Sequence, residues 1–364
     1  MSENAARPRY TVFLLMLVYA NSFLDRQIIS ILAEDIKLDL QISDTQMGIL
    51  TGLAFALLYA TLGLPIARLA DRFHRIGIIA ICMTLWSAMA VMCGLARNYV
   101  ELAAARVGVG VGEAGALPAS HSIIADLYSP EERSTAMAVF QMGVPIGVLL
   151  GFLVGGWVTE WFDWRTTLIL TGAPGILLSA ILFFTVKEPK RQLVQTSVEA
   201  KPKTDFFKTV ASLMKIPTYR QLCFAATLAS MGGYALLSWT PALLIRSFEI
   251  PTPIVGTALA LIIGIGGGLG TYAVGRAADI WARYNASGPL YAAALTCIFA
   301  VPSYILAFYL SEPIMIFMAL TPGFFLLLAW MGPNWAMVQD VAPVHARAVA
   351  SAFILFVLNL VGLG

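Results

Sequence analysis

Charged side chains are scarce in this sequence of 364 residues. Asp, Glu, Lys and Arg make up 12% of it, whereas 59% of the residues are hydrophobic. A typical soluble protein is about a quarter charged, and a disordered chain is far less apolar than this one. The composition therefore excludes an ordinary soluble enzyme, a collagen-like chain and a disordered protein. It predicts a membrane protein that crosses the bilayer several times.

Cysteine and histidine are also rare. The four cysteines lie in apolar runs, where a thiol packs as a small hydrophobic group, and they have neither metal-site nor disulfide-framework spacing. The three histidines lie on separate segments and form no His-x-x-Glu-His motif. We therefore expect no metal, no cofactor and no catalytic residue. A membrane-embedded lipid-modifying enzyme is a remote alternative.

Apolar runs recur between short polar segments, each about the 20 residues that span the hydrocarbon core as a helix. They predict an all-α, polytopic membrane protein. The expected spans are 11–32, 47–69, 77–97, 101–126, 134–156, 165–186, 218–247, 254–276, 287–310 and 313–340, with an eleventh from near Ala348 that stops at Gly364. The start of the chain is short and polar, and we expect no removable signal peptide.

The lysines and arginines predict the orientation. With a cytoplasmic N-terminus, most of the 23 lie at cytoplasmic ends of the spans, and only Lys37, Arg97, Arg165 and Arg246 lie outside. This asymmetry follows the positive-inside rule, and we place the protein in the plasma (inner) membrane. Residues 187–217 are polar and Lys-rich, which predicts a cytoplasmic linker between an N-terminal bundle at 1–186 and a C-terminal bundle at 218–364.

Two charge patterns repeat along the chain. Asp71-x3-Arg75 recurs as Asp279-x3-Arg283, and Asp126-x6-Arg133 recurs as Asp340-x6-Arg347, at offsets of 208 and 214 residues. Similar offsets indicate duplicated halves. Asp–Arg pairs between neighbouring helix ends would hold the cytoplasmic face closed, so we expect a cytoplasmic gate. Its members are Asp71, Arg72, Arg75, Asp126, Arg133, Asp279, Arg283, Asp340 and Arg347; helix capping is the alternative.

Several segments resemble signatures of the major facilitator superfamily. They are the loop Leu69-Ala-Asp71-Arg72-Phe-His-Arg75, the run from Arg106 to Glu113, and the glycine ladder Gly143-x3-Gly147-x3-Gly151-x3-Gly155. Ala67 and His74 depart from the loop signature, which usually has glycine there. The resemblance implies the major facilitator fold, with two pseudo-symmetric six-helix bundles. It also implies twelve helices, of which the last one or two are incomplete or missing here, and a monomer.

Within the superfamily, the sequence is similar to the spinster family of lysolipid transporters. The segments that carry this similarity are Asn21-Ser-Phe-Leu-Asp25-Arg26, Gly110-Val-Gly112-Glu113-Ala114 and Gly332-Pro-Asn334. The resemblance implies a secondary transporter that moves a lysophospholipid or a sphingosine-1-phosphate-like lipid by alternating access. No P-loop is present, so the energy would come from a gradient or from the substrate itself.

Four charged residues fall well inside predicted spans: Asp25, Arg26, Arg106 and Glu113. A charge at a helix centre costs about 2.5–3.5 kcal/mol, so these residues are the default functional site. Arg106 and Glu113 are two helical turns apart on one face. We expect Asp25 to pair with Arg106 and Glu113 to lack a partner, which makes Glu113 and Asp25 candidate proton carriers. The alternative is a fully paired, structural Glu113.

The predicted partners are an amphiphilic lipid substrate, protons and membrane lipids, with no nucleic acid. By the resemblance, helices one, four, seven and ten line the cavity, with the head group on Arg26 and Arg106 and the tail on Trp239 and Trp330. The candidate substrate-binding residues are Asn21, Arg26, Arg106, Glu113, Tyr234, Trp239, Trp330 and Asn334. A small organic anion, such as a sugar acid or carboxylate in symport with protons, is the competing substrate. The glycine ladder is expected to serve close helix packing.

Overall fold

The computed structural model describes residues 8–362, except for 56–58, 60, 63–65, 67–72, 129–135, 138, 190–205, 286 and 344–345. The described residues form helices, turns and short connections, with no strand among them. Eight helices in this part of the chain are long and apolar enough to cross a membrane. The chain is therefore a multi-pass integral membrane protein with an all-α fold, as the composition predicts.

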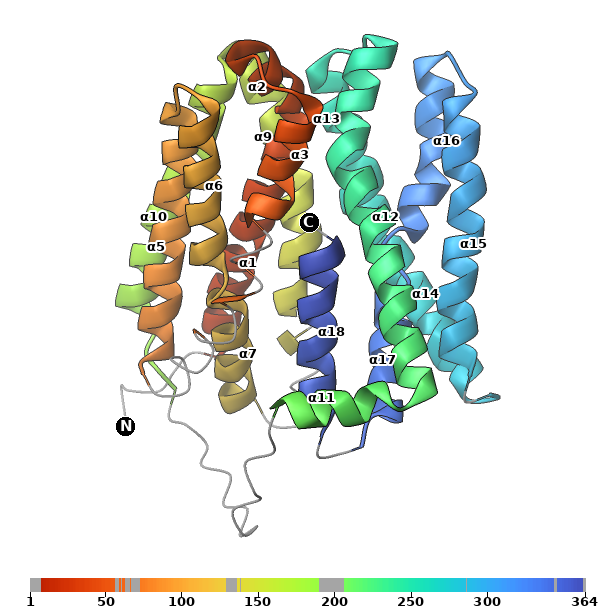
Figure 1. Ribbon diagram of the computed structural model, residues 1–364. Coiled ribbons are helices and arrows are strands. Elements are labelled where there is room, and N and C mark those ends of the chain that lie inside the picture. Colours follow the sequence, from red (N-terminus) through yellow and green to blue (C-terminus); the bar gives the residue numbers. More distant parts are fainter. Residues whose placement is uncertain are drawn as a thin grey trace. The chain divides into compact units, whose positions relative to one another are not determined.

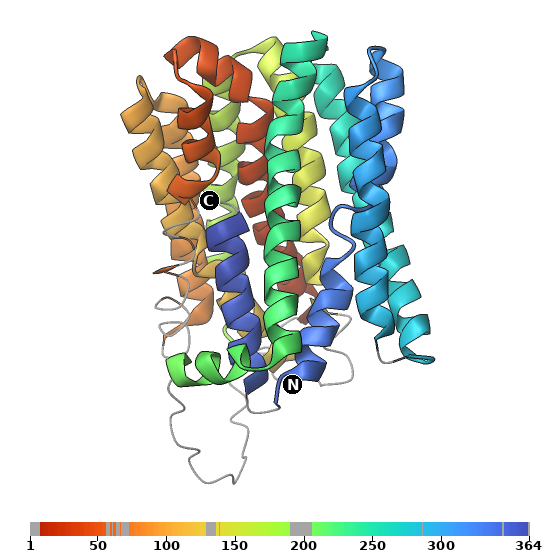
Figure 2. The ribbon, with the colours of Figure 1, turned by 45° about the vertical axis from the view of Figure 1, so that its right-hand side comes forward.

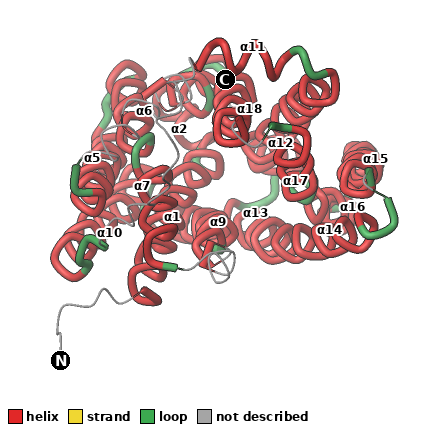
Figure 3. The backbone as a smooth tube through the Cα atoms, turned by 90° about the horizontal axis from the view of Figure 1, so that it is seen from below, coloured by secondary structure: helices red, strands yellow, loops and turns green. Residues whose placement is uncertain are grey.

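The chain forms two compact units. The first comprises Met1–Leu193 together with Ser238–Ala260. Its helices are α1 (Pro8–Ile31), α2 (Ala33–Leu40), α3 (Asp44–Thr51), α5 (Arg75–Leu95), α6 (Tyr99–Glu113), α7 (Ala116–Leu127), α9 (Gly143–Trp161), α10 (Trp164–Thr185) and α13 (Thr252–Leu259). Within this unit α5 packs against α10 and α6, and α1 packs against α9, as the view along the helices in Figure 3 shows.

The glycine ladder brings α9 onto α1. A Cβ atom on Gly147 would lie 2.3 Å from the carbonyl oxygen of Ala20, and one on Gly143 would lie 2.6 Å from that of Met16. Gly151 and Gly155 are similarly close to side chains of α1. Only glycine permits helices to approach this closely, so the packing role predicted for the ladder is confirmed.

The second unit comprises Val194–Leu237 and Leu261–Leu363. It contains α11 (Phe206–Met214), the first part of α12 (Pro217–Phe248), most of the π-helix Ala260–Gly266, α14 (Gly267–Ala282), α15 (Gly288–Phe308), α16 (Pro313–Leu326), α17 (Met331–Val341) and α18 (Arg347–Gly362). In Figures 1 and 2, α11 runs across the lower ends of α12 and α18. Its Leu213 joins a core that includes Tyr219, Trp330 and Ile354, so this residue of the helix is buried in protein.

The fourth and tenth predicted spans are not continuous helices. The fourth, 101–126, breaks at Ala114 and Gly115 between α6 and α7, and the tenth, 313–340, breaks at residues 327–330 between α16 and α17. The repeat offset of 214 maps Ala114 and Gly115 onto residues 328 and 329, so the two breaks coincide in the duplicated halves.

The compact units differ from the predicted division at 238–260. This segment, the end of α12 with α13, follows the predicted linker in sequence but belongs to the first unit. There α13 crosses α9 closely: a Cβ on Gly256 would lie 2.4 Å from the carbonyl oxygen of Phe152, and the Trp157 indole donates a hydrogen bond to the Thr257 hydroxyl over 3.0 Å. The predicted boundaries 1–186, 187–217 and 218–364 remain a prediction about the duplicated halves.

Candidate functional site

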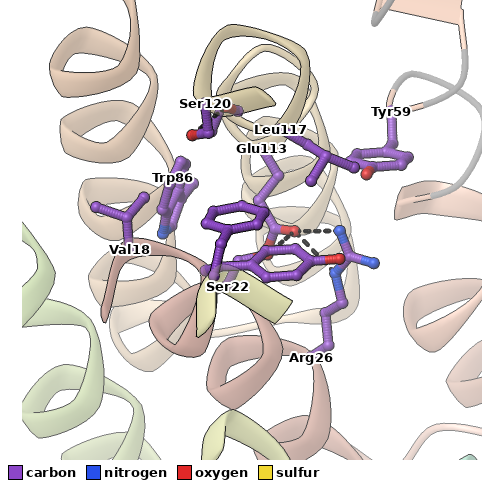
Figure 4. A pocket seen from close by; sticks show the side chains of 11 residues that line it. Val18, Ser22, Arg26, Tyr59, Trp86, Glu113, Leu117 and Ser120 are labelled. Carbon is purple, nitrogen blue, oxygen red and sulfur yellow. Dashed lines mark hydrogen bonds and ion pairs between the residues drawn. The ribbon is translucent and has the colours of Figure 1, made fainter. Parts of the chain in front are cut away.

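The Glu113 carboxylate is the centre of a buried cluster in the first unit. Its Oε2 accepts hydrogen bonds from Nε and Nη2 of Arg26, over 2.8 and 2.5 Å, and from the hydroxyl of Ser22, over 2.6 Å (Figure 4). The side chain of Glu113 is 1% exposed and that of Arg26 is 11% exposed. This pairing differs from the expectation that Glu113 lacks a partner, because Arg26 reaches across from α1.

Aromatic rings surround the Arg26 guanidinium. Its Cζ lies 5.1, 4.6 and 4.8 Å from the ring centroids of Phe23, Phe55 and Tyr59. A guanidinium near a ring face gains cation–π attraction, which grows when water is excluded. The glycines of α6 help to bring these rings in, because a Cβ on Gly110 would lie 2.7 Å from the carbonyl oxygen of Phe55.

Asp25 lies beside this cluster without a hydrogen bond. It is 3% exposed, and neither carboxylate oxygen has a hydrogen-bond partner among the described residues. Glu113, Arg106 and Arg26 are all near enough to interact with it electrostatically. Within the described part of the chain, Arg106 has one hydrogen bond, a long one of 3.4 Å from Nε to the carbonyl oxygen of Leu50. The four charged residues converge, but the expected Asp25–Arg106 ion pair does not form.

A pocket opens beside Glu113. It is small, with a volume of about 10 Å³ open to a water molecule, and is lined by Val18, Tyr19, Ser22, Arg26, Tyr59, Trp86, Glu113, Ala116, Leu117, Ser120 and Phe140. Figure 4 shows the carboxylate and guanidinium on one side of it and apolar side chains around them. Glu113 is the last residue of α6, so the helix break lies at the pocket wall. This volume holds about one water molecule and is far below that of small-molecule sites, so a head group would enter only if the pocket widened.

The other predicted substrate-binding residues have varied surroundings. Asn21 accepts a hydrogen bond from the Trp86 indole over 3.0 Å and faces Gly175 of α10, so it supports the pocket wall. Trp239 lies near Gly48 in the first unit. In the second unit, Trp330 belongs to the hydrophobic core and Asn334 is 6% exposed. Tyr234 lies near Gly362 in that unit.

A second charge cluster lies at the start of α5, the predicted cytoplasmic end. The Arg75 side chain is 2% exposed and donates to Asp126, over 2.5 Å, to Glu188, over 2.6 Å, and to Ser122, over 2.8 Å. It also donates to the carbonyl oxygen of Pro189. Of the predicted gate, the structure therefore brings Arg75 and Asp126 together within the first unit.

The remaining gate residues give no such cluster. Asp71, Arg72 and Arg133 lie outside the described residues, as does the side chain of Arg347. Asp279, Arg283 and Asp340 are exposed, and no ion pair of theirs is found in the described part of the second unit. Sequence reasoning missed Ser22 and Glu188. An acidic residue between two lysines just after the sixth span was the available signal for Glu188.

A third charge cluster joins α2, α3 and the end of α12, at the ends that the sequence predicts to lie outside the membrane. Arg246 donates to Glu34, over 2.6 and 3.2 Å, and to Asp44, over 2.8 and 3.1 Å, and Lys37 also contacts Asp44. These two cations lower the pKa of Asp44 to about 2. Burial, together with neighbouring carboxylates, raises the pKa of Asp35. The acidic first loop and the few basic residues at this end were the signal for this network.

No group of His, Cys, Asp or Glu among the described residues has the geometry to hold a metal ion. The chemistry that these clusters support is therefore that of charged and polar side chains: binding ions through arginine or carboxylate groups, and taking up or releasing protons. The free cysteines Cys82, Cys93 and Cys223 are buried and Cys297 is exposed.

Comparison with known proteins shows the family of this chain. The sequence matches the Major Facilitator Superfamily over residues 15–364. It is 32% identical to an MFS-type efflux pump of Mycolicibacterium smegmatis over 348 residues, which is 95% of this chain and 80% of that protein. It is also 32% identical to protein spinster homolog 1 of Xenopus tropicalis over 242 residues, 65% of this chain but only 46% of that protein.

A solved structure is similar over the whole chain. It is the crystal structure of a bacterial homolog to the human lysosomal transporter spinster, in an inward-facing and unoccupied conformation. The TM-score is 0.84 at 29% sequence identity, and the alignment covers 100% of this chain and 81% of that one. The all-helical fold and the spinster resemblance of the sequence are thus both confirmed.

Proposed function

Because this chain belongs to the Major Facilitator Superfamily and is a spinster-like secondary transporter, not an enzyme, we propose that it moves an amphiphilic lysolipid by alternating access. The observation that carries this proposal is the pocket beside Glu113, which combines buried charges with aromatic walls. An amphiphile presents both a charged head and an apolar tail, and such a pocket suits the head.

Arg106 is the proposed contact for the anionic part of the head group. Arg26 is committed to Glu113, whereas Arg106 is 2% exposed, lies 5.6 Å from the Phe55 ring centroid, and among the described residues has one long hydrogen bond, to a backbone carbonyl. Arg106 is not among the residues that line the pocket, so the pocket would have to widen toward it before its guanidinium could bind a phosphate in bidentate fashion. Contacts of the tail with Tyr234, Trp239, Trp330 and Asn334 stay a prediction.

Asp25 is the proposed proton carrier, with Glu113 as its coupled neighbour. Both Asp25 oxygens lack a hydrogen-bond donor among the described residues, whereas Oε2 of Glu113 accepts three hydrogen bonds. A buried charge without donors is costly, so a proton arriving at Asp25 would relieve that cost. We also propose a plasma-membrane location with a cytoplasmic N-terminus.

The test is uptake of a labelled lysophospholipid into proteoliposomes with an imposed pH gradient. We expect uptake to depend on the gradient in the wild type, and Asp25→Asn and Glu113→Gln to lose that dependence. Glu101→Gln is the matched control, since this carboxylate lies at the exposed start of α6, where it accepts hydrogen bonds from the Arg97 backbone and the Asn98 side chain. Wild-type pH dependence in Asp25→Asn would reject its role.

A small organic anion is the second candidate substrate, and the volume of the pocket favours it. The pocket has room for about one water molecule, so a sugar acid or dicarboxylate would have to widen it less than a lysolipid. Uptake of glucarate in the same proteoliposomes, without uptake of lysophospholipid, would favour this candidate. Arg106→Ala should weaken the binding of either substrate, so this variant does not distinguish the two candidates.

A further inference from the structure

The short helix α11 and the turn after it carry two lysines on one side. Lys208 lies in the helix and Lys215 in the tight turn that follows it, seven residues further on, which is about two helical turns. Both lie roughly 140–160° around the helix axis from Leu213, which is 2% exposed and packs into the core of the second unit. Both lysines are exposed, as are Ala211 and Ser212. The side of α11 opposite to Leu213 is therefore basic.

The two lysines belong to a long stretch without acidic residues. Residues 206–248 include no aspartate or glutamate, and the nearest acidic residue in the sequence, Asp205, lies outside the described residues. Neither lysine forms an ion pair with another described residue. In the first unit, by contrast, Arg75, Arg165 and Arg246 each pair with a carboxylate. The basic side of α11 therefore suits an anion from outside the chain.

The position of α11 indicates which anion is at hand. The helix α12, which is long and apolar enough to cross a membrane, begins at Pro217, two residues after Lys215. In Figures 1 and 2, α11 runs across the lower ends of α12 and α18, and in Figure 3 it lies on the outer side of both. A helix that crosses the end of a spanning helix lies in the plane of the membrane interface, at the level of the phospholipid head groups. Lysine side chains extend from such a helix to that level.

We propose that Lys208 and Lys215 bind the head groups of anionic phospholipids in the leaflet next to α11, which the sequence predicts to be the cytoplasmic one. This lipid is a bound component of the membrane and not the transported substrate, so the proposal does not depend on the function proposed above. Its effect reaches the helices, because Leu213 shares its core with Ala350 of α18. The Tyr219 hydroxyl, at the start of α12, donates to the carbonyl oxygen of Ala350 over 2.9 Å. Bound lipid therefore steadies the lower ends of both helices.

A fluorophore beside the two lysines tests the contact. It is attached through Ser212→Cys, in a Cys297→Ser background because Cys297 is the exposed native cysteine. The full chain is placed in phosphatidylcholine nanodiscs with a trace of phosphatidylglycerol or phosphatidylcholine that carries a nitroxide high on one acyl chain. Quenching then measures how often each lipid lies next to α11. Because the two labelled lipids differ only in the head group, their difference in quenching reports the charge.

The expected preference follows from the two charges. Each lysine at an anionic membrane surface contributes a factor of about five, so the pair should enrich labelled phosphatidylglycerol over labelled phosphatidylcholine by roughly thirtyfold. Equal quenching by the two lipids would overturn the proposal and leave the lysines simply solvated.

Three variants locate the contact. Lys208→Gln combined with Lys215→Gln should remove most of the preference, whereas Lys208→Arg combined with Lys215→Arg should keep it. Arg276→Gln removes an exposed cation from α14, which lies away from α11 in Figure 3, and should also keep it. These side chains are exposed, and surface substitutions seldom affect folding. A full preference in the glutamine double variant would reject the two lysines as the site, and its loss in the arginine double variant would reject charge as the cause.

Salt and a soluble anion distinguish a lipid surface from a site for free anions. Salt screens the attraction between exposed charges, so raising sodium chloride from about 0.1 M to about 1 M should reduce the phosphatidylglycerol preference. A preference that salt leaves unchanged would contradict an electrostatic contact. Glycerol phosphate has a similar charged group but no acyl chains, and at the concentration of the labelled lipid it should leave the quenching unchanged. Displacement of the lipid by glycerol phosphate would reject the membrane as the source of the anion.

Discussion

The two buried carboxylates should differ in how much stability depends on their surroundings: loss of the arginine that pairs with Glu113 should be costly, whereas neutralising Asp25 should not. Arg26→Ala removes two hydrogen bonds from Glu113, whose side chain is 1% exposed, and leaves its charge uncompensated. Removing one partner of a buried ion pair costs about 3–5 kcal/mol. Asp25→Asn removes no hydrogen bond, because neither oxygen of Asp25 has a partner among the described residues. We expect its cost to stay within about 1 kcal/mol.

Thermal unfolding of the detergent-purified protein, followed by tryptophan fluorescence at neutral pH, measures this difference. At roughly 1–2 °C per kcal/mol for a chain of this length, Arg26→Ala should lower the apparent melting temperature by roughly 5 °C. Asp25→Asn should remain within about 2 °C of the wild type, as should the control Glu101→Gln. An Asp25→Asn variant as unstable as Arg26→Ala would refute the assigned pairing.

Three further predictions concern packing and the charge clusters. Arg75→Lys should lower the melting temperature nearly as much as Arg75→Ala, because an ammonium group cannot replace the contacts of a buried, forked guanidinium. Gly147→Ala should destabilise the fold by about 1–3 kcal/mol through overpacking, whereas Gly232→Ala, where a Cβ would meet nothing within 4 Å, should be neutral or stabilising in the same melts. Asp44→Asn should lose a stabilisation that the wild type keeps above about pH 4, the ordinary carboxyl pKa, and loses as the pH falls toward about 2; a difference between the two proteins that grows on acidification would contradict the Arg246 contact.

The fold and the position of the site could be read from the sequence. Long apolar runs leave few alternatives to membrane-spanning helices, and the cost of buried charge singles out Asp25, Arg26, Arg106 and Glu113. The seven-residue spacing of Arg106 and Glu113 also places them on one face. These inferences need only composition and helical periodicity, which do not depend on how helices rotate against each other.

The pairing within the site could not be read in the same way. Asp25 and Arg26 are adjacent, so their side chains leave α1 about 100° apart, and the rotation of α1 decides which one meets Glu113. That rotation is set by contacts such as the approach of Gly147 to Ala20. The helix break after Glu113 was missed for a related reason, since apolar residues continue through it.

Comparison of the two halves shows that the helix break and the buried charged residues have different causes. Both halves break at equivalent positions, at Ala114 and Gly115 and at residues 327–330, yet only the first half carries charged residues there. In the second half, Trp330 occupies the break and packs into a hydrophobic core. Buried charge therefore cannot be what interrupts the helix. The break is a feature that both halves share. In the first half the residue before it is Glu113, so a carboxylate stands at the end of α6, beside the pocket.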